Sequence, residues 1–273
     1  MADKQSRDPR AELGSKIQFD VPHSARIWNY WMGGKDNYEV DQAAGDAWIA
    51  KDPGVVNEAK QSRQFLIRAV RFLAGEAGIR QFLDIGTGLP TMQNTHEVAQ
   101  NVAPDSRIVY VDNDPLVLAH ARALLTNTTP EGVTTYIDAD FHHPEQIVSD
   151  ARNVLNFHQP IAVMFMGVLG HTADIDEARS IVARVMDAVS SGSYLTLWDS
   201  ANTDKTAVAA MGEYNETGAV PYIQRSPEQI SQCFEGLDLL DPGFVPISLW
   251  RPDTTEVGTI NLTYSQGAVA RKP

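Results

Sequence analysis

The chain has 273 residues, of which 43% are hydrophobic and 21% charged, and this suits one large globular domain. Its net charge of −13 repels phosphate backbones, so we expect no nucleic-acid partner. The polar first residues contain no apolar leader, and no stretch approaches the roughly 18 apolar residues of a membrane span. We therefore expect a cytoplasmic protein with no membrane partner.

The N-terminal part of the chain differs in character from the rest. Residues 1–20 are polar and are predicted to form a flexible N-terminus. Residues 21–75 hold three of the five tryptophans and the Gly33-Gly34 pair, which predicts a cap of short helices joined by a glycine turn. An apolar stripe at helical spacing predicts a helix over 57–74. The polar face of this helix is expected to carry Arg63, Arg68 and Arg71.

From residue 80 onward, short apolar runs alternate with amphipathic stretches. Strands that alternate with helices imply βαβ units and a parallel sheet. The continuous apolar run 161–166 is typical of a strand that is buried on both faces. The predicted strands are 81–86, 107–112, 133–138, 161–166 and 193–199, and the predicted helices lie near 95–102, 115–125, 144–155 and 176–190.

Several helix starts carry capping signals. Asp114-Pro115 and Ser226-Pro227 each place a capping residue before a proline at the first helical position. Asn94 with Glu97 forms a pair like a capping box. A further helix is predicted over about 227–235. Two strands, 244–252 and 256–266, are then expected to form a C-terminal antiparallel hairpin.

The strongest functional signal is an acid followed by a glycine turn, Asp84-Ile85-Gly86-Thr87-Gly88. Glycine lets the backbone turn sharply and approach a ligand closely, because it has no Cβ. A related turn in dinucleotide-binding folds holds a pyrophosphate at a helix N-terminus. The Asp84 carboxylate would repel a pyrophosphate but attract the ammonium group of an amino acid. This favours S-adenosylmethionine (SAM) over NAD as the cofactor.

Two later aspartates extend this pattern. Asp112 ends the second apolar run, and an acid there can accept hydrogen bonds from both ribose hydroxyls. Asp140 follows the third run and can accept from an adenine amino group, while the Phe141 backbone contacts the ring. Three acids in this order at the ends of successive strands predict an adenosine cofactor.

The chain resembles a bacterial family of SAM-dependent methyltransferases, class I in fold, whose substrates are largely unassigned. The resemblance implies SAM as cofactor and a Rossmann-like α/β sheet of seven strands whose last hairpin is antiparallel. Pro90 stands where a third glycine is usual, which predicts a longer, stiffer turn and a late helix start near Asn94. The family's cofactor positions carry over to Asp84, Gly86, Gly88, Asp112 and Asp140. The resembling segments are 25–41, 81–100, 108–125, 138–147, 234–252 and 267–273.

The aromatic cap is predicted to close over the cofactor. Tyr30 and the Gly33-Gly34 turn are expected above the SAM carboxylate and sulfonium, and Arg26 is expected to pair with that carboxylate. The alternative is that Tyr30 and the neighbouring tryptophans are packing anchors. The full set of predicted cofactor-binding residues is Arg26, Tyr30, Gly33, Gly34, Asp84, Gly86, Thr87, Gly88, Asp112, Asn113, Asp140, Phe141, Met166 and Gly167.

The best candidate for a catalytic base is His171, which follows the fourth predicted strand and titrates near neutral pH. The alternative is a hydrogen-bonded loop histidine, and Asp199 is a weaker candidate base. We predict no metal site, because His142-His143 has no further ligand at metal-binding spacing. The single cysteine, Cys233, allows no internal disulfide and is expected to be a partly buried structural thiol.

Residues 76–273 are thus predicted to be a SAM-binding Rossmann-like methyltransferase domain that acts on a small molecule. One alternative is a non-catalytic SAM-binding or regulatory protein. The other is an NAD-dependent oxidoreductase, which Asp84 disfavours, as does Thr91 at the position of a third fingerprint glycine. The acceptor, the atom that is methylated and the oligomeric state stay open.

Overall fold

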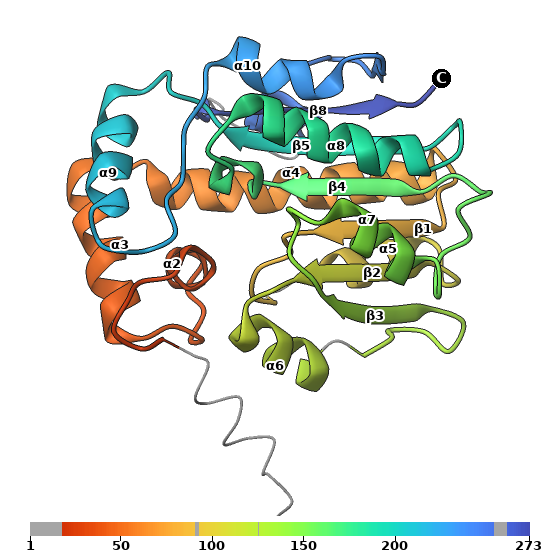
Figure 1. The fold of residues 1–273 in the computed structure, drawn as a ribbon, viewed down its shortest axis with the longest axis horizontal. Helices are drawn as coiled ribbons and strands as arrows, with labels where there is room; N and C mark the ends of the chain where they lie inside the picture. The colour runs from red at the N-terminus through yellow and green to blue at the C-terminus, as the bar shows by residue number, and fades with distance from the viewer. Residues whose placement is uncertain (1–17, 91–92, 125, 254–260) are drawn as a thin grey trace, which may run out of the picture.

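The computed structural model describes residues 18–273 with the exception of 91–92, 125 and 254–260. A sheet runs through the centre, with helices on both of its faces (Figure 1). Its strand order is β3-β2-β1-β4-β5-β8-β6, and β7 also pairs with β8. Neighbouring strands from β1 to β5 are parallel, whereas β8 is antiparallel to β5. This is the predicted Rossmann-like class I methyltransferase sheet with a reversed last strand.

The five parallel strands lie within one residue of their predicted bounds, because each is a locally apolar run. They are β1 Gln81–Ile85, β2 Arg107–Asp112, β3 Val133–Asp138, β4 Ala162–Met166 and β5 Tyr194–Ser200. The sheet has eight strands rather than the expected seven. Two short strands, β6 and β7, each pair with β8 over only two residues. The antiparallel strands are β6 Asp238–Leu239, β7 Val245–Pro246 and β8 Ser265–Arg271.

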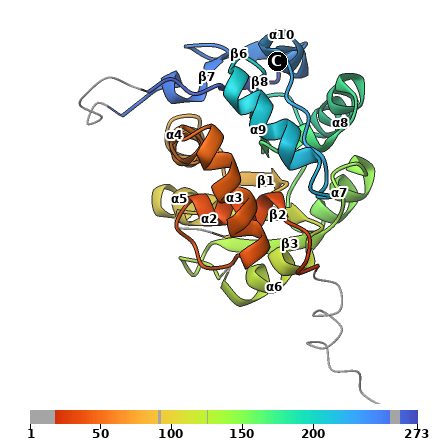
Figure 2. The ribbon, with the colours of Figure 1, turned by 90° about the vertical axis from the view of Figure 1, so that its left-hand side faces the viewer.

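Helices cover the sheet in two layers. One face packs against α4 and α5, and the other against α7, α8 and α10 (Figure 2). The α-helices are α2 Ser24–Trp31, α3 Glu39–Lys51, α4 Val55–Gly75, α5 Thr95–Val102, α6 Pro115–Leu124, α7 Pro144–Ala151, α8 Ile175–Ala188, α9 Lys205–Asn215 and α10 Pro227–Ser231. Short 3-10 turns are η1 Leu169–His171, η2 Gln232–Phe234 and η3 Ile247–Leu249.

The predicted capping signals act as expected. Asn94 and Ser226 each form a capping box, and the Asp114 carboxylate accepts from the Leu116 amide at 2.7 Å. Helix α9 was not predicted, although its capping residue Asp204 accepts from two backbone amides. Cys233 is buried, as expected, and burial raises the pKa of its thiol to about 12.

The C-terminal hairpin departs from the predicted bounds. Residues 247–249 form η3 instead of a strand, and most of the long antiparallel strand lies beyond the predicted 256–266. The physical reason is Trp250, which is fully buried with its ring 5.5 Å from that of Phe65. Seating this indole bends the chain out of the sheet. Part of the predicted second strand, 256–260, lies outside the described residues.

Helix α4 packs along the sheet and shares its core, so it differs from the expected cap helix. The predicted polar face is also wrong for Arg68, which is buried and donates to the Trp250 and Ile247 carbonyl oxygens at 2.8 and 2.7 Å. Arg68 therefore fastens the bent C-terminal segment to α4. Arg71 is exposed, as expected.

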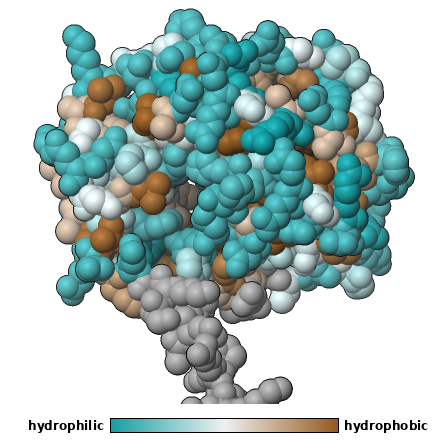
Figure 3. Space-filling model, viewed as in Figure 1, coloured by the Kyte–Doolittle hydropathy of each residue, from teal (hydrophilic) through white to brown (hydrophobic). Residues whose placement is uncertain are grey.

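The helices at the carboxyl ends of the parallel strands are α2, α3 and α9 (Figure 1). They pack through a separate aromatic cluster that includes Trp31, Trp48 and Tyr214. No helix in the described part of the chain is long and apolar enough to cross a membrane. On the face that Figure 3 shows, hydrophobic residues occur in small groups among hydrophilic ones, in keeping with the acidic composition.

Replacing Arg68 with methionine is expected to lower the free energy of unfolding by about 2–4 kcal/mol. The change leaves two buried carbonyl oxygens without their charged donor. Urea denaturation of Arg68→Met measures the loss, and the matched exposed variant Arg71→Met is expected to stay within about 0.5 kcal/mol of the parent. Equal stabilities for the two variants would contradict this account.

Candidate functional site

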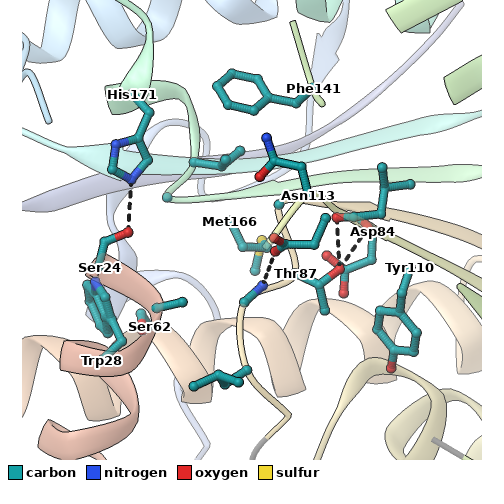
Figure 4. A pocket seen from close by; sticks show the side chains of 18 of the residues that line it. Ser24, Trp28, Ser62, Asp84, Thr87, Tyr110, Asn113, Phe141, Met166 and His171 are labelled. Atoms are coloured by element: carbon teal, nitrogen blue, oxygen red, sulfur yellow. Dashed lines mark hydrogen bonds between the residues drawn. The ribbon is translucent and has the colours of Figure 1, made fainter. Parts of the chain in front are cut away.

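A cavity of about 380 Å³ lies at the carboxyl ends of β1, β2 and β4, beneath α2 (Figure 4). In open α/β sheets, ligands bind at the carboxyl ends of the strands, at the point where the strand order reverses. Here the reversal falls between β1 and β4, which are neighbours in the sheet. The predicted residues that line the cavity are Asp84, Gly86, Thr87, Gly88, Asp112, Asn113, Asp140, Phe141, Met166, Gly167 and His171.

The glycine turn after β1 has the backbone that only glycine adopts easily. Gly86 and Gly88 have φ angles of 72° and 66°. A Cβ on Gly86 would lie 2.4 Å from the Val168 side chain, so the turn and the loop after β4 are in close contact. The Gly88 amide donates to the Asp112 carboxylate at 2.8 Å. The turn thus helps to fix the acid at the end of β2.

Asp84 is buried, with 3% of its surface exposed. Thr95 Oγ1, at the start of α5, donates to Asp84 Oδ2 at 2.7 Å. Burial raises the pKa of Asp84 to about 6, although the Thr95 hydrogen bond and the positive charge of Arg63 act in the opposite direction. The helix begins late, after its cap Asn94, as the proline in the turn predicts. Residues 91–92 of this turn lie outside the described residues.

Arg63 on α4 lines the same cavity and was missed as a site residue, because sequence analysis placed it on the polar helix face. It forms no hydrogen bond or ion pair with any residue that the structure describes. Burial lowers the pKa of its guanidinium, while the negative charge of Asp84 acts to raise it. The missed signal was a stripe of cavity-lining residues at helical spacing, Ala59, Ser62, Arg63 and Leu66.

The far end of the cavity carries two more carboxylates. Asp112 accepts from the Gly88 and Asp114 amides, and burial raises its pKa. Asp140 accepts from both the backbone amide and the Nδ1 of His142, at 2.9 and 2.6 Å. Burial acts to raise the pKa of Asp140, but these hydrogen bonds lower it overall. The Phe141 and His142 rings lie 4.1 Å apart between centroids.

His171 contacts Ser24 across the cavity (Figure 4). Its Nδ1 lies 2.9 Å from the carbonyl oxygen of Pro221, which can only accept, so Nδ1 carries the proton. Nε2 is then free to accept from the Ser24 hydroxyl at 3.1 Å. Burial lowers the pKa of the imidazole, so it is neutral near pH 7.

Asp199, the weaker candidate base, does not line the cavity. It is buried behind Tyr222, whose hydroxyl donates to it, and its other oxygen lies 3.6 Å from Arg225. Burial raises the pKa of Asp199 to about 6. Arg225 also donates to the Leu169 and Thr172 carbonyl oxygens. This network fixes the Tyr222 wall of the cavity and the η1 turn that carries His171.

Four predicted cofactor contacts lie outside the cavity: Arg26, Tyr30, Gly33 and Gly34. Arg26 Nε lies 2.9 Å from Asp41, and its other nitrogens donate to the carbonyl oxygens of Gln18 and Val21. Tyr30 donates to Asp46.

Helical periodicity explains these positions. Ser24, Trp28 and Met32 of α2 and its C-cap face the cavity at spacings of four, which turns Arg26 and Tyr30 to other sides. The four outlying residues therefore anchor the cap, and we leave them out of the proposed binding site. Within the described part of the chain, no three His, Cys, Asp or Glu side chains gather in a way that could hold a metal ion.

A parallel sheet with a reversed last strand and an acid–glycine turn facing a cavity defines a class I methyltransferase. The chain belongs to the S-adenosyl methyltransferase family, whose model matches residues 10–273. It is a SAM-dependent methyltransferase, and SAM is its cofactor.

Solved structures agree with this assignment. A family protein of formerly unknown function from Streptomyces avermitilis is 40% identical, with a TM-score of 0.88 over 93% of this chain and 99% of that chain. A candidate methyltransferase from Thermobifida fusca is also 40% identical, with a TM-score of 0.86 over 98% and 99%. A SAM-dependent methyltransferase from Anabaena variabilis shares the fold alone, at 16% identity and a TM-score of 0.52 over 85% and 95%. No curated protein sequence matches the chain.

Replacing Asp84 with asparagine is expected to stabilise the ligand-free protein at pH 8 by up to about 3 kcal/mol. The pKa of this carboxyl is about 6 in the folded protein against 3.8 ordinarily, and each unit corresponds to about 1.4 kcal/mol. Because the folded state favours the protonated form, ionisation costs stability above pH 6. Below about pH 4 both states are protonated and the difference vanishes.

Urea denaturation of Asp84→Asn and the parent at pH 4 and pH 8 measures this effect. The exposed Asp138, at the end of β3 in the same sheet, supplies the control variant Asp138→Asn, for which no comparable change is expected. A variant that is less stable than the parent at pH 8 would show that the buried carboxylate is not strained.

Proposed function

We propose that this enzyme binds SAM in the 380 Å³ cavity and transfers the sulfonium methyl group to a small-molecule acceptor. One observation carries the assignment of the site: the Arg63 guanidinium, which has no hydrogen bond or ion pair with the residues that the structure describes, lines the cavity near the buried Asp84 carboxylate. Opposite charges at one end of a cavity match the carboxylate and ammonium of an amino acid. The bound cofactor supplies an electrophilic methyl group.

The methionine end of the cofactor is assigned to Arg63, Asp84 and the glycine turn. Arg63 binds the α-carboxylate, for which a planar guanidinium is suited. Asp84 accepts from the α-ammonium, and this neighbouring cation favours the ionised carboxylate that burial disfavours. The bend at Gly86 and Gly88 leaves room for the chain of the ligand to pass close to the backbone.

The nucleoside end is assigned to the acids that follow β2 and β3. Asp112 accepts from the ribose hydroxyls, and the adjacent Asn113 lines the same part of the cavity. Asp140 accepts from the adenine amino group, and the Phe141 ring covers the base. The order of these residues along the chain follows the order of the strands in the sheet, β1, β2 and β3.

The methyl group is assigned to the region of Met166, Gly167 and Trp28, where β4 and the loop after it meet α2 at the cavity. Exclusion of water and positioning of the acceptor supply much of the rate in such a site. His171 acts as general base for an acceptor that must lose a proton. Its Nδ1–H is fixed by Pro221, which leaves Nε2 directed to Ser24 and the cavity.

We also propose a cytoplasmic, bacterial enzyme without a nucleic-acid partner. The net charge of −13 supports the last point, because phosphate backbones are repelled. The free Cys233 fits a reducing compartment. The two solved proteins at 40% identity come from the bacteria Streptomyces avermitilis and Thermobifida fusca.

Replacing Arg63 with glutamine is expected to weaken SAM binding about tenfold to a hundredfold. The variant loses charge-assisted hydrogen bonds worth about 1.5–3 kcal/mol to the α-carboxylate. Isothermal titration with SAM measures the change, and Arg71→Gln on the exposed side of the same helix is the matched control. If Arg63→Gln binds SAM as tightly as the parent, the proposed orientation of the cofactor is wrong. Tighter binding of NAD than of SAM by the parent would refute the proposed function.

Replacing His171 with alanine is expected to lower methyl transfer at least about a hundredfold, with SAM affinity unchanged. Tritiated SAM and the small-molecule fraction of a bacterial extract provide the assay, read as label in low-molecular-weight products. The exposed His158 gives the control variant His158→Ala. If His171→Ala transfers the methyl group as fast as the parent, His171 is not the general base, and positioning of the acceptor accounts for catalysis.

A further inference from the structure

A second, smaller cavity of about 40 Å³ lies among α2, α3, α4 and α9, on the far side of α2 from the glycine turn. We call it the aromatic cavity. Ser24, Trp28 and Tyr222 line both this cavity and the cofactor cavity, so the two share a wall. The shared wall adjoins His171, because Ser24 Oγ lies 3.1 Å from His171 Nε2 and the Tyr222 ring packs on the imidazole with centroids 5.1 Å apart.

Aromatic rings form most of the aromatic cavity. Trp31 and Trp48 pack edge to face with centroids 5.4 Å apart, and Tyr214 lies 6.2 Å from Trp48. Trp28, Tyr222 and Tyr264 complete the aromatic lining. Faces of tryptophan and tyrosine rings carry negative potential and attract cations.

One acid, Glu58 on α4, also lines the aromatic cavity and is only 3% exposed. It accepts from the backbone amides of Ser265 and Tyr264 at 2.7 and 3.3 Å. It forms no ion pair with any residue in the described part of the chain, and the charge that acts on it most is another acid, Asp52. A buried carboxylate without a counter-ion is costly.

Two further polar groups of the aromatic cavity lie beside its acids. Among the described residues, Ser265 Oγ and Trp48 Nε1 are buried without a hydrogen bond of good geometry, but Ser265 lies close enough to Glu58, and Trp48 to Asp52, to act to lower the pKa of that acid. Both side chains line the cavity, and Ser265 is 1% exposed while Trp48 is 8% exposed. Of these two groups only the Ser265 hydroxyl can accept from an ammonium, because an indole N–H donates only.

We propose that the aromatic cavity binds the primary ammonium group of the methyl acceptor, with Glu58 as its counter-ion. This inference rests on the proposed function in one respect: the ammonium group is taken to belong to the methyl acceptor. With a volume of about 40 Å³ against about 380 Å³ for the cofactor cavity, the aromatic cavity suits a small group such as an ammonium. Rings supply cation–π attraction, and the carboxylate supplies the charge.

The acceptor is therefore an amine-bearing small molecule that is held by its cationic end. In this proposal the rest of the molecule lies against Ser24, Trp28 and Tyr222, the residues that line both cavities. Glu58 is a binding residue for this cation. The anionic character of the surroundings, with Asp52 at the C-terminal end of α3, disfavours an acceptor that presents a carboxylate here.

Methylammonium chloride is the probe for this site, because it carries the proposed group and almost nothing else. Titration into the full-length protein, followed by tryptophan fluorescence, is expected to give a dissociation constant of about 10 mM, in keeping with so small a ligand. Methanol, a neutral molecule of similar size, and sodium chloride at equal ionic strength are expected to give no saturable change.

Glu58→Gln is expected to weaken methylammonium binding at least about tenfold, while SAM affinity stays unchanged. The matched control is Glu177→Gln, at an exposed position on α8. Trp48→Leu provides a second, independent variant that removes one ring and keeps the carboxylate, with an expected loss of about threefold to tenfold. Binding to the parent is expected to weaken below about pH 7, because burial raises the pKa of Glu58 to about 7. The groups that face Glu58 are Asp52, Tyr264 and Ser265, none of them cationic.

The outcomes separate the two proposals. If SAM binds but methylammonium does not, the aromatic cavity is not an ammonium site and the proposed function stands. Unchanged methylammonium binding in Glu58→Gln, or in Trp48→Leu should the first variant fail to fold, overturns the inference as well. If methylammonium binds through Glu58 but SAM does not bind, the proposed function fails and the cation site remains.

Discussion

The organisation of this molecule depends on a carboxylate that is removed from water near the end of its first parallel strand. Asp84 lies in β1, whose residues are all buried, and burial disfavours its charge. Two neighbours from different elements reduce that cost: the hydroxyl of Thr95 at the start of α5 and the positive charge of Arg63 on α4. Both helices pack on one face of the sheet, so the core that they build also fixes the electrostatics of the cavity.

The other wall of the cavity is held by a second set of buried charges. Asp199, Tyr222 and Arg225 form one network, and Arg225 ties it to the carbonyl oxygens around η1. A buried ion pair contributes little to stability by itself, but it can fix a unique arrangement of the groups around it. Here that arrangement sets the positions of His171 and of the ring that separates the two cavities.

What could be predicted from sequence depended on how local the signal was. The parallel strands and the acids at their ends were predicted correctly in position because each is a short pattern along the chain. Arg63 was missed, since only the packing of α4 turns it toward the cavity. Arg26 was expected to contact the ligand, but it pairs with Asp41 instead. Asp41 lies in another helix, so nothing in the local sequence around Arg26 indicates this contact. The C-terminal hairpin was misplaced because its position also depends on a distant contact. Trp250 packs against residues of α4, which are far away in the sequence.

The wall that the two cavities share has a consequence for how such an enzyme can diverge. A substitution at Trp28 or Tyr222 changes the surroundings of both ligands at once, so selection on the acceptor there is constrained by selection on the cofactor. Met211 and Tyr214 on α9, by contrast, line only the aromatic cavity. New acceptor preferences can therefore arise on α9 without disturbing the cofactor cavity, and homologues are expected to vary there first.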